Sequence, residues 1–86
     1  MITKNGMQLG VVYVVTQSSK NGEFLVGERV RLMDNGDIMN ISIGGWIMSE
    51  NVDAATEGMF LKVDQEWLSK KRKEVQEQLA LLDSIV

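Results

Sequence analysis

The spacing of hydrophobic and polar residues changes near residue 64, and this change divides the chain into two parts. Up to residue 63, short apolar runs alternate with polar segments rich in Gly, Asn and Ser, which is typical of strands and turns. From residue 64 onward no Gly or Pro interrupts the chain, and apolar residues recur at helical spacing. The pattern predicts a β-rich part over residues 1–63 and one amphipathic helix over residues 64–86, which together form a single structural unit.

Several strands are predicted in the first part. Residues 9–16 contain the β-branched and aromatic run Val11-Val12-Tyr13-Val14-Val15, and such continuous apolarity indicates a strand that is covered on both faces. The next strand alternates, with Val30 and Leu32 directed inward. Further strands are expected around residues 38–43, 46–48 and 59–63. Trp46 and Phe60 are expected in the core.

The segment Asp34-Asn35-Gly36-Asp37 is predicted to form a tight hairpin turn of type I′, because Asn and Gly tolerate the positive φ that this turn needs. The same segment resembles the start of a calcium-binding loop. Position twelve of such a loop carries a bidentate Glu, and here that position is Gly45. The hairpin turn is therefore preferred, and no metal site is expected.

The predicted helix has a defined start and one apolar stripe. Asp64 is a suitable N-cap, and Glu66 in the first turn suits the helix dipole. The stripe follows heptad spacing, with Arg72 at its one polar position. It consists of Leu68, Val75, Leu79, Leu82 and Val86. At a rise of 1.5 Å per residue the helix is roughly 33 Å long, which exceeds the width of a small barrel. A second copy of the same helix is the simplest cover for the stripe, so we expect a homo-oligomer, with a dimer favoured.

Residues 9–55 resemble the SH3-like small β-barrels. Their opening strand is similar to Val11-Val12-Tyr13-Val14-Val15, their diverging turn to Gly27-Glu28, and their closing strand and 3₁₀ turn to residues 45–52. The resemblance implies a small SH3-like barrel, and a bent antiparallel sheet is the alternative. The implied fold class is α+β and mainly β, with one long C-terminal helix. Met48 and Asn51 stand where the family has the proline and tyrosine of its ligand groove, so binding of proline-rich peptides is not expected.

Composition limits the chemistry of the chain. It has no Cys and no His, which excludes disulfides and thiolate chemistry and removes the usual general base near neutral pH. No motif for a nucleophile, a metal cluster or a phosphate-binding loop is present. We therefore expect no catalytic residues, no cofactor and no enzyme activity. The absence of a long apolar run or a signal peptide favours a cytoplasmic protein that does not enter a membrane.

Two sets of residues are candidates for contact with a partner. Tyr13 and Trp67 are aromatic, and Trp67 could equally attach the helix to the sheet. The only basic run is Lys70, Lys71, Arg72 and Lys73. It could contact phosphate or an acidic protein, or it could be a solvated helix face paired with Glu66, Glu74 and Glu77.

These features favour a non-enzymatic protein-interaction module. We expect a small regulator or inhibitor, of the kind found among bacteriophage accessory proteins, that binds another protein of unknown identity and self-associates through its helix. The alternative is a small barrel that binds nucleic acid through the basic helix segment. The net charge of −3 disfavours that alternative, because nucleic-acid binding draws on a basic field.

Overall fold

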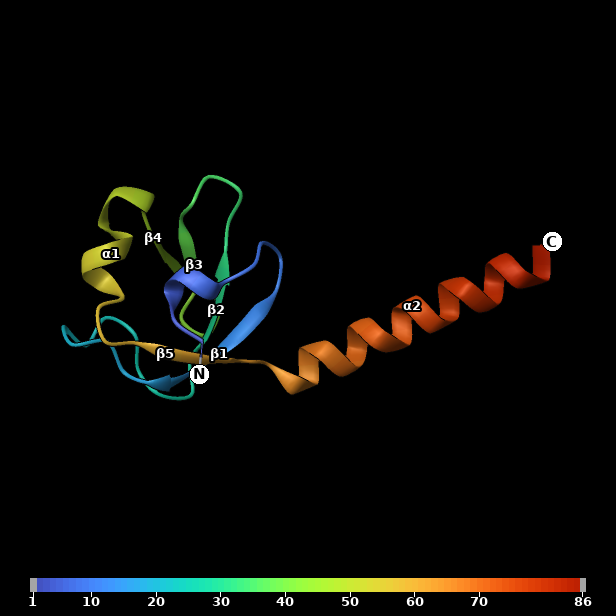
Figure 1. Ribbon diagram of the computed structural model, residues 1–86, viewed down its shortest axis with the longest axis horizontal. Helices are drawn as coiled ribbons and strands as arrows, with labels where there is room; N and C mark the ends of the chain where they lie inside the picture. The colour runs from blue at the N-terminus through green and yellow to red at the C-terminus, as the bar shows by residue number, and fades with distance from the viewer. Residues whose placement is uncertain (1, 86) are drawn as a thin grey trace.

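The protein folds as one antiparallel sheet followed by a long helix (Figure 1). The computed structural model describes residues 2–85, with side chains described up to residue 79. The strands are β1 (Val12–Gln17), β2 (Arg29–Leu32), β3 (Ile38–Asn40), β4 (Gly45–Ile47) and β5 (Phe60–Val63). The helices are the 3₁₀ helices η1 (Lys4–Gly6) and η2 (Ser49–Asn51) and the α-helices α1 (Val52–Ala55) and α2 (Gln65–Ile85). The predicted class, α+β and mainly β with a C-terminal helix, is confirmed.

The sheet has the strand order β4-β3-β2-β1-β5 and is not closed into a barrel. Each strand of this order pairs antiparallel with its neighbour. β4 and β5 stand at the two edges, and in the described part of the chain they do not pair with each other. Of the two forms expected from the sequence, the structure shows a bent antiparallel sheet that is compatible with a small barrel-like fold.

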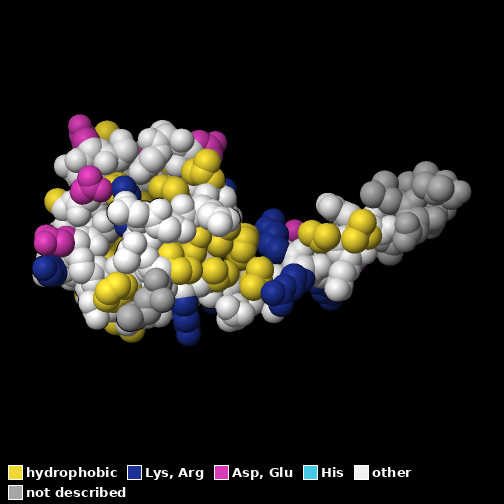
Figure 2. All heavy atoms as spheres, in the orientation of Figure 1, with side chains coloured by type: hydrophobic (Ala, Val, Ile, Leu, Met, Phe, Trp, Pro, Cys, Tyr) yellow, Lys and Arg dark blue, Asp and Glu magenta, His cyan; other side chains and the backbone are white. Residues whose placement is uncertain are grey.

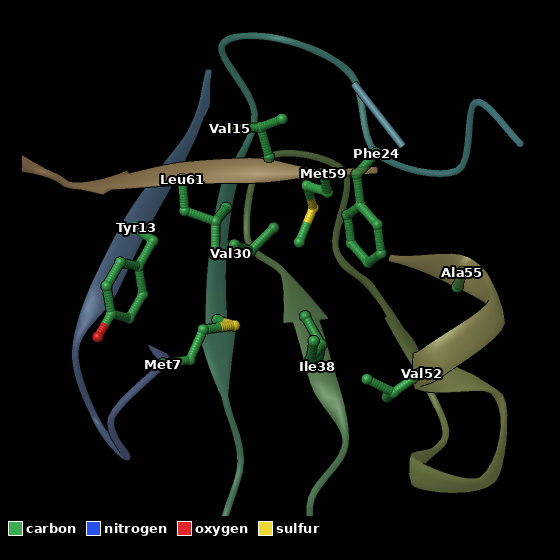
Figure 3. Packing of buried hydrophobic residues seen from close by; sticks show 10 residues of the cluster. All are labelled: Met7, Tyr13, Val15, Phe24, Val30, Ile38, Val52, Ala55, Met59 and Leu61. Atoms are coloured by element: carbon green, nitrogen blue, oxygen red, sulfur yellow. The ribbon is translucent and has the colours of Figure 1, made fainter. Parts of the chain in front are cut away.

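One face of the sheet carries the core (Figure 3). The cluster draws on β1, β2, β3 and β5, on the loops and on α1. Its members are Met7, Tyr13, Val15, Phe24, Val30, Ile38, Val52, Ala55, Met59 and Leu61. Ile47 packs against this cluster from β4, as its place in the predicted closing strand requires. The β-rich part therefore buries a core of its own, to which α2 contributes none of its side chains described up to residue 79.

Strand register decides which side chains enter this core. Val30 lies opposite Asn40, so both belong to the buried face, whereas Arg31 lies opposite Met39 on the outer face. Met39 in turn lies opposite Trp46. Trp46 is consequently on the outer face and 62% exposed, and the prediction that it belongs to the core is wrong. Phe60 was also expected in the core, but it is only half-buried and lies outside the buried cluster.

The hairpin between β2 and β3 turns where the sequence predicts, but with a different geometry. The N–H of Gly36 donates to the carbonyl of Met33, and the N–H of Met33 donates to that of Asp37. Gly36 has a φ of +89°, whereas Asn35 is not among the residues with positive φ. A type I′ turn needs positive φ at both central residues, so the type I′ prediction is wrong. A type I turn followed by a left-handed Gly makes the reversal instead.

The start of α2 is confirmed. The N–H of Glu66 donates to Oδ1 of Asp64 at 3.1 Å, which is the bond expected of an N-cap side chain. The N–H of Leu68 donates to the carbonyl of Asp64, which begins the helical ladder. From this point α2 leads away from the sheet, and the molecule extends over 53 × 24 × 22 Å (Figure 1).

No helix within residues 2–85 combines the length and the apolar character that a membrane span requires.

Candidate interaction surfaces

α2 exposes the apolar stripe that the sequence predicts. Leu68, closest to the sheet, is half-buried. Val75 and Leu79 lie further out and are 53% and 56% exposed. Leu82 and Val86, the other two members of the predicted interface, lie outside the residues whose side chains are described. Figure 2 shows hydrophobic atoms part-way along the projecting helix, separated from those of the β-rich part by Lys and Arg side chains.

Ion pairs attach the first turn of α2 to β2. Nε of Arg29 lies 3.0 Å from Oδ2 of Asp64, and its Nη2 lies 2.7 Å from Oε2 of Glu66. Asp64 is buried, whereas Arg29 and Glu66 are exposed. Asp64 therefore has two roles, because one oxygen caps the helix and the other pairs with the sheet. This arrangement fixes where the helix leaves the sheet.

Trp67 lies beside this junction and is half-buried. It lines a shallow hollow together with Val12 of β1, Arg29 of β2 and Ile41, which follows β3. The ring thus covers part of the outer face of the sheet and keeps part of its surface open. Both expected roles, attachment of the helix and contact with a partner, are compatible with this position.

The basic run is fully displayed on α2. All four side chains, from Lys70 to Lys73, are exposed. Nζ of Lys70 lies 3.7 Å from Oε1 of Glu66, which is the predicted i,i+4 pair. Nζ of Lys71 lies 3.3 Å from Oε2 of Glu74, which is another of the acidic residues expected to pair with the run. Among the described residues, Arg72 and Lys73 form no ion pair, so about half of the basic charge is available to a partner.

Tyr13 is not available to a partner. It is 2% exposed, and its hydroxyl oxygen accepts a hydrogen bond from the N–H of Gln8 at 2.9 Å. A buried tyrosine with a satisfied hydroxyl is a core residue. Tyr13 is buried because of the register of β1. It lies opposite Val30 of β2 and Val63 of β5, and it shares the buried face of the sheet with Val30.

The surface that sequence reasoning missed surrounds Trp46. Across the outer face of the sheet, Arg31, Met39 and Trp46 stand directly opposite one another on β2, β3 and β4. They line a hollow of about 420 Å³ together with the β2–β3 hairpin. The lengths of the β2–β3 and β3–β4 connections are the sequence signal that could have revealed this surface. They determine the strand register, and therefore which residues of β2, β3 and β4 share a face.

Nothing in the described residues resembles a metal centre. No group of three or more acidic side chains is placed to hold an ion there. The hairpin carboxylate Asp37 instead accepts hydrogen bonds from the N–H of Ser49 at 2.7 Å and from Nδ2 of Asn35 at 3.1 Å. It joins the hairpin to η2, which is a structural role.

Comparison of the chain with protein-family models, with curated proteins and with solved structures found no match in any of the three.

Proposed function

We propose that this protein is a non-enzymatic interaction module, a small regulator or inhibitor that binds another protein and self-associates through α2. The observation that carries the proposal is the combination of a 21-residue helix that leads away from the sheet with the exposure of Val75 and Leu79 on it. The β-rich part forms its buried cluster without any of the α2 side chains that the structure describes.

The energetics of an isolated helix support a partner for α2. A lone helix of this length is marginal in water, and most helices are stabilised by packing an apolar face. Burial of a Val or Leu side chain contributes about 1.5–3 kcal/mol relative to full exposure. Val75 and Leu79 are about half exposed, so roughly half of this free energy remains to be gained when a partner covers them. A second copy offers the same stripe in the same spacing, so each helix covers the other with coiled-coil packing.

We further infer that the β-rich part is related in architecture to the SH3-like barrels. The strand order β4-β3-β2-β1-β5 and a 3₁₀ turn, η2, before the last strand support this inference. Domains of that architecture serve many unrelated functions, so the likeness of fold supports a binding role only by analogy.

Solution mass across a concentration series, measured by sedimentation, tests self-association. The chain should approach dimer mass as its concentration rises. Val75→Asp combined with Leu79→Asp should keep it monomeric, because two buried charges would face each other in the interface. Lys70→Asp with Glu77→Asp is the matched control, since it changes the net charge by the same amount on the same helix. A monomeric wild-type chain at every concentration would reject the proposal.

Binding of nucleic acid is the second candidate, and the exposure of Lys70, Lys71, Arg72 and Lys73 on a projecting helix favours it. Arg29 is less suited to this role, because Asp64 and Glu66 already neutralise it. The measurement is retention of single-stranded and duplex oligonucleotides at several salt concentrations. Affinity that falls steeply with salt, and that is lost in Arg72→Gln with Lys73→Gln, would favour this candidate.

A further inference from the structure

The outer side of β4 is an unpaired strand edge, and the hydrogen-bond pattern shows which of its groups are free. The N–H of Ile41 donates to the carbonyl of Arg29, and the N–H of Met33 donates to that of Asp37, each at 2.8 Å. In an antiparallel sheet, consecutive residues direct their main-chain groups to opposite neighbours. By this alternation, Met39 directs its main chain toward β2.

The same alternation continues into β4. Ile38 and Asn40 direct their main chains toward β4, where they stand opposite Ile47 and Gly45. Trp46, between these two, therefore directs its N–H and C=O away from β3. Because β4 is at the edge of the described sheet, no strand receives these two groups. Such a free donor and acceptor on an edge strand is a template for another strand.

Two hollows lie along this edge. The larger measures about 370 Å³ and is bounded by β4, by Asn21 and Glu23 and by α1. The smaller measures about 130 Å³ and extends from Trp46 to Phe24 and Asn40. Their lining, within the described residues, includes the carboxylate of Glu23 and no Lys or Arg. The edge thus borders two hollows, of which the smaller is mainly apolar, and Glu23 is the one charged residue that lines both.

A buried polar group in the smaller hollow lacks a partner. Asn40 is 3% exposed, and its Oδ1 accepts a hydrogen bond from the N–H of Ser42 at 3.1 Å. Its Nδ2 is the one buried side-chain nitrogen without a hydrogen bond within the described part of the chain. The bond from Ser42 sets the orientation of the amide, because a flipped amide would place two donors together. Asn40 marks the place where the smaller hollow reaches β3.

We propose that an extended segment of a partner protein adds to β4 as a sixth strand. Its main chain pairs with the N–H and C=O of Trp46, and it lies along the two hollows beside this edge. A Lys or Arg of the segment lies near Glu23 and over the exposed face of Trp46, which attracts cations. The strand geometry makes this a case of β-strand addition.

This partner differs from a second copy of the chain. Residues 45–47 of a second copy contain no basic residue, and pairing of two β4 edges would bring two Glu23 carboxylates to the same rim. The inference rests on the proposed function insofar as the segment belongs to a protein, but it uses no residue of α2.

The test is selection of peptides from a phage-displayed library of random linear dodecapeptides on the full chain. Enriched peptides should carry Lys or Arg and alternate apolar with polar residues, with no requirement for Pro. Trp46→Pro removes only the outward N–H and the indole, since proline is tolerated on strand edges. It should weaken binding about tenfold or more, a loss of 1.4 kcal/mol or more. Leu9→Ala, which trims a side chain of similar exposure elsewhere, should leave binding unchanged.

Two further measurements keep the test decisive if Trp46→Pro does not fold. Methylation of the peptide nitrogen atoms on one edge should abolish binding, because it blocks strand pairing. The side-chain amide resonances of Asn40 should shift in the NMR spectrum of the complex. Failure to enrich peptides, equal binding by the methylated peptide, or an unmoved Asn40 amide would overturn the proposal.

Self-association through α2 and strand addition at β4 can be tested independently of each other. The chain carrying Val75→Asp and Leu79→Asp should bind the same peptides as the wild type, because none of the described residues of α2 lines the two hollows. Peptide binding by a wild-type chain that stays monomeric would reject self-association and support strand addition. If the wild type is a dimer that Trp46→Pro converts to a monomer, the occupant of the edge is a second copy and the proposed partner is wrong.

Discussion

The β-rich part and α2 are stabilised in opposite ways. In the β-rich part, Val30 and Ile38 are completely buried, and each lies on a strand that pairs with a neighbour on both sides. Along α2, every described side chain from residue 69 to residue 79 is exposed. The first part therefore owes its stability to contacts within the chain, whereas the second depends on its cap, its ion pairs and whatever covers its stripe. The comparison teaches that one short sequence can specify a self-sufficient core and an interaction element side by side.

The largest effect is expected from a cavity in the β-rich part. Phe24→Ala removes a ring that is buried in the core, and such truncations cost about 3–5 kcal/mol of unfolding free energy. The β-rich part should then lose a large share of its stability, because small domains are stable by only about 5–15 kcal/mol. Urea unfolding followed by tryptophan fluorescence measures this. Leu9→Ala is the control, and a loss as small as in that variant would show that the core is not the source of stability.

A smaller effect is expected where the two parts meet. Asp64→Ala removes the N-cap bond to Glu66 and the pair with Arg29, and loss of a cap costs about 0.5–2 kcal/mol. Helix content from circular dichroism should fall, while the urea midpoint of the β-rich part changes little. Gln65→Ala, one residue further on, is the control. If Asp64→Ala lowered the helix content of α2 and the urea midpoint of the β-rich part together, α2 and the sheet would unfold as one unit. The two parts would then not be stabilised independently.

The next prediction concerns the contact between the β2–β3 hairpin and η2. Gly36 has a φ of +89°, and a Cβ on it would lie 3.3 Å from Cβ of Ser49. Gly36→Ala should cost about 1–2 kcal/mol from the left-handed backbone alone, with an added cost from the contact. Gly44→Ala at a φ of +77°, where a Cβ meets nothing, isolates the backbone part. Thermal unfolding of both variants gives the difference, and a larger loss from Gly44→Ala would contradict this account.

The smallest effect is expected on the exposed face of α2. Lys70→Gln removes the pair with Glu66, and an exposed i,i+4 pair contributes about 0.3–0.5 kcal/mol. Helix content at low salt should fall slightly and should equal that of the wild type at high salt, where the pair is screened. Lys73→Gln, which removes a side chain with no ion pair in the described residues, is the control. A greater loss of helix content from Lys73→Gln would contradict the assignment of this contribution to the pair between Lys70 and Glu66.

The local features of the fold could be read from the chain. The run from Val11 to Val15 contains most of β1, the cap at Asp64 starts α2, and the turn between β2 and β3 lies at residues 33–37. In each case the signal is short-range, because β-branching, capping and turn formation involve residues that are neighbours in sequence. The spacing of the stripe on α2 is local in the same sense.

The tertiary structure alone decided which side chains face the core. Tyr13 and Trp46 look alike as aromatic residues of predicted strands, yet one is buried and the other exposed. Asn40 is buried although it is polar, because it stands opposite Val30. The physical reason is the two-residue period of a strand, in which the register set by distant hairpins assigns each residue to a face. The sequence by itself determined most of the strands, the start of α2 and the spacing of its stripe, while pairing between strands determined the core, the open edge of β4 and the hollows beside Trp46.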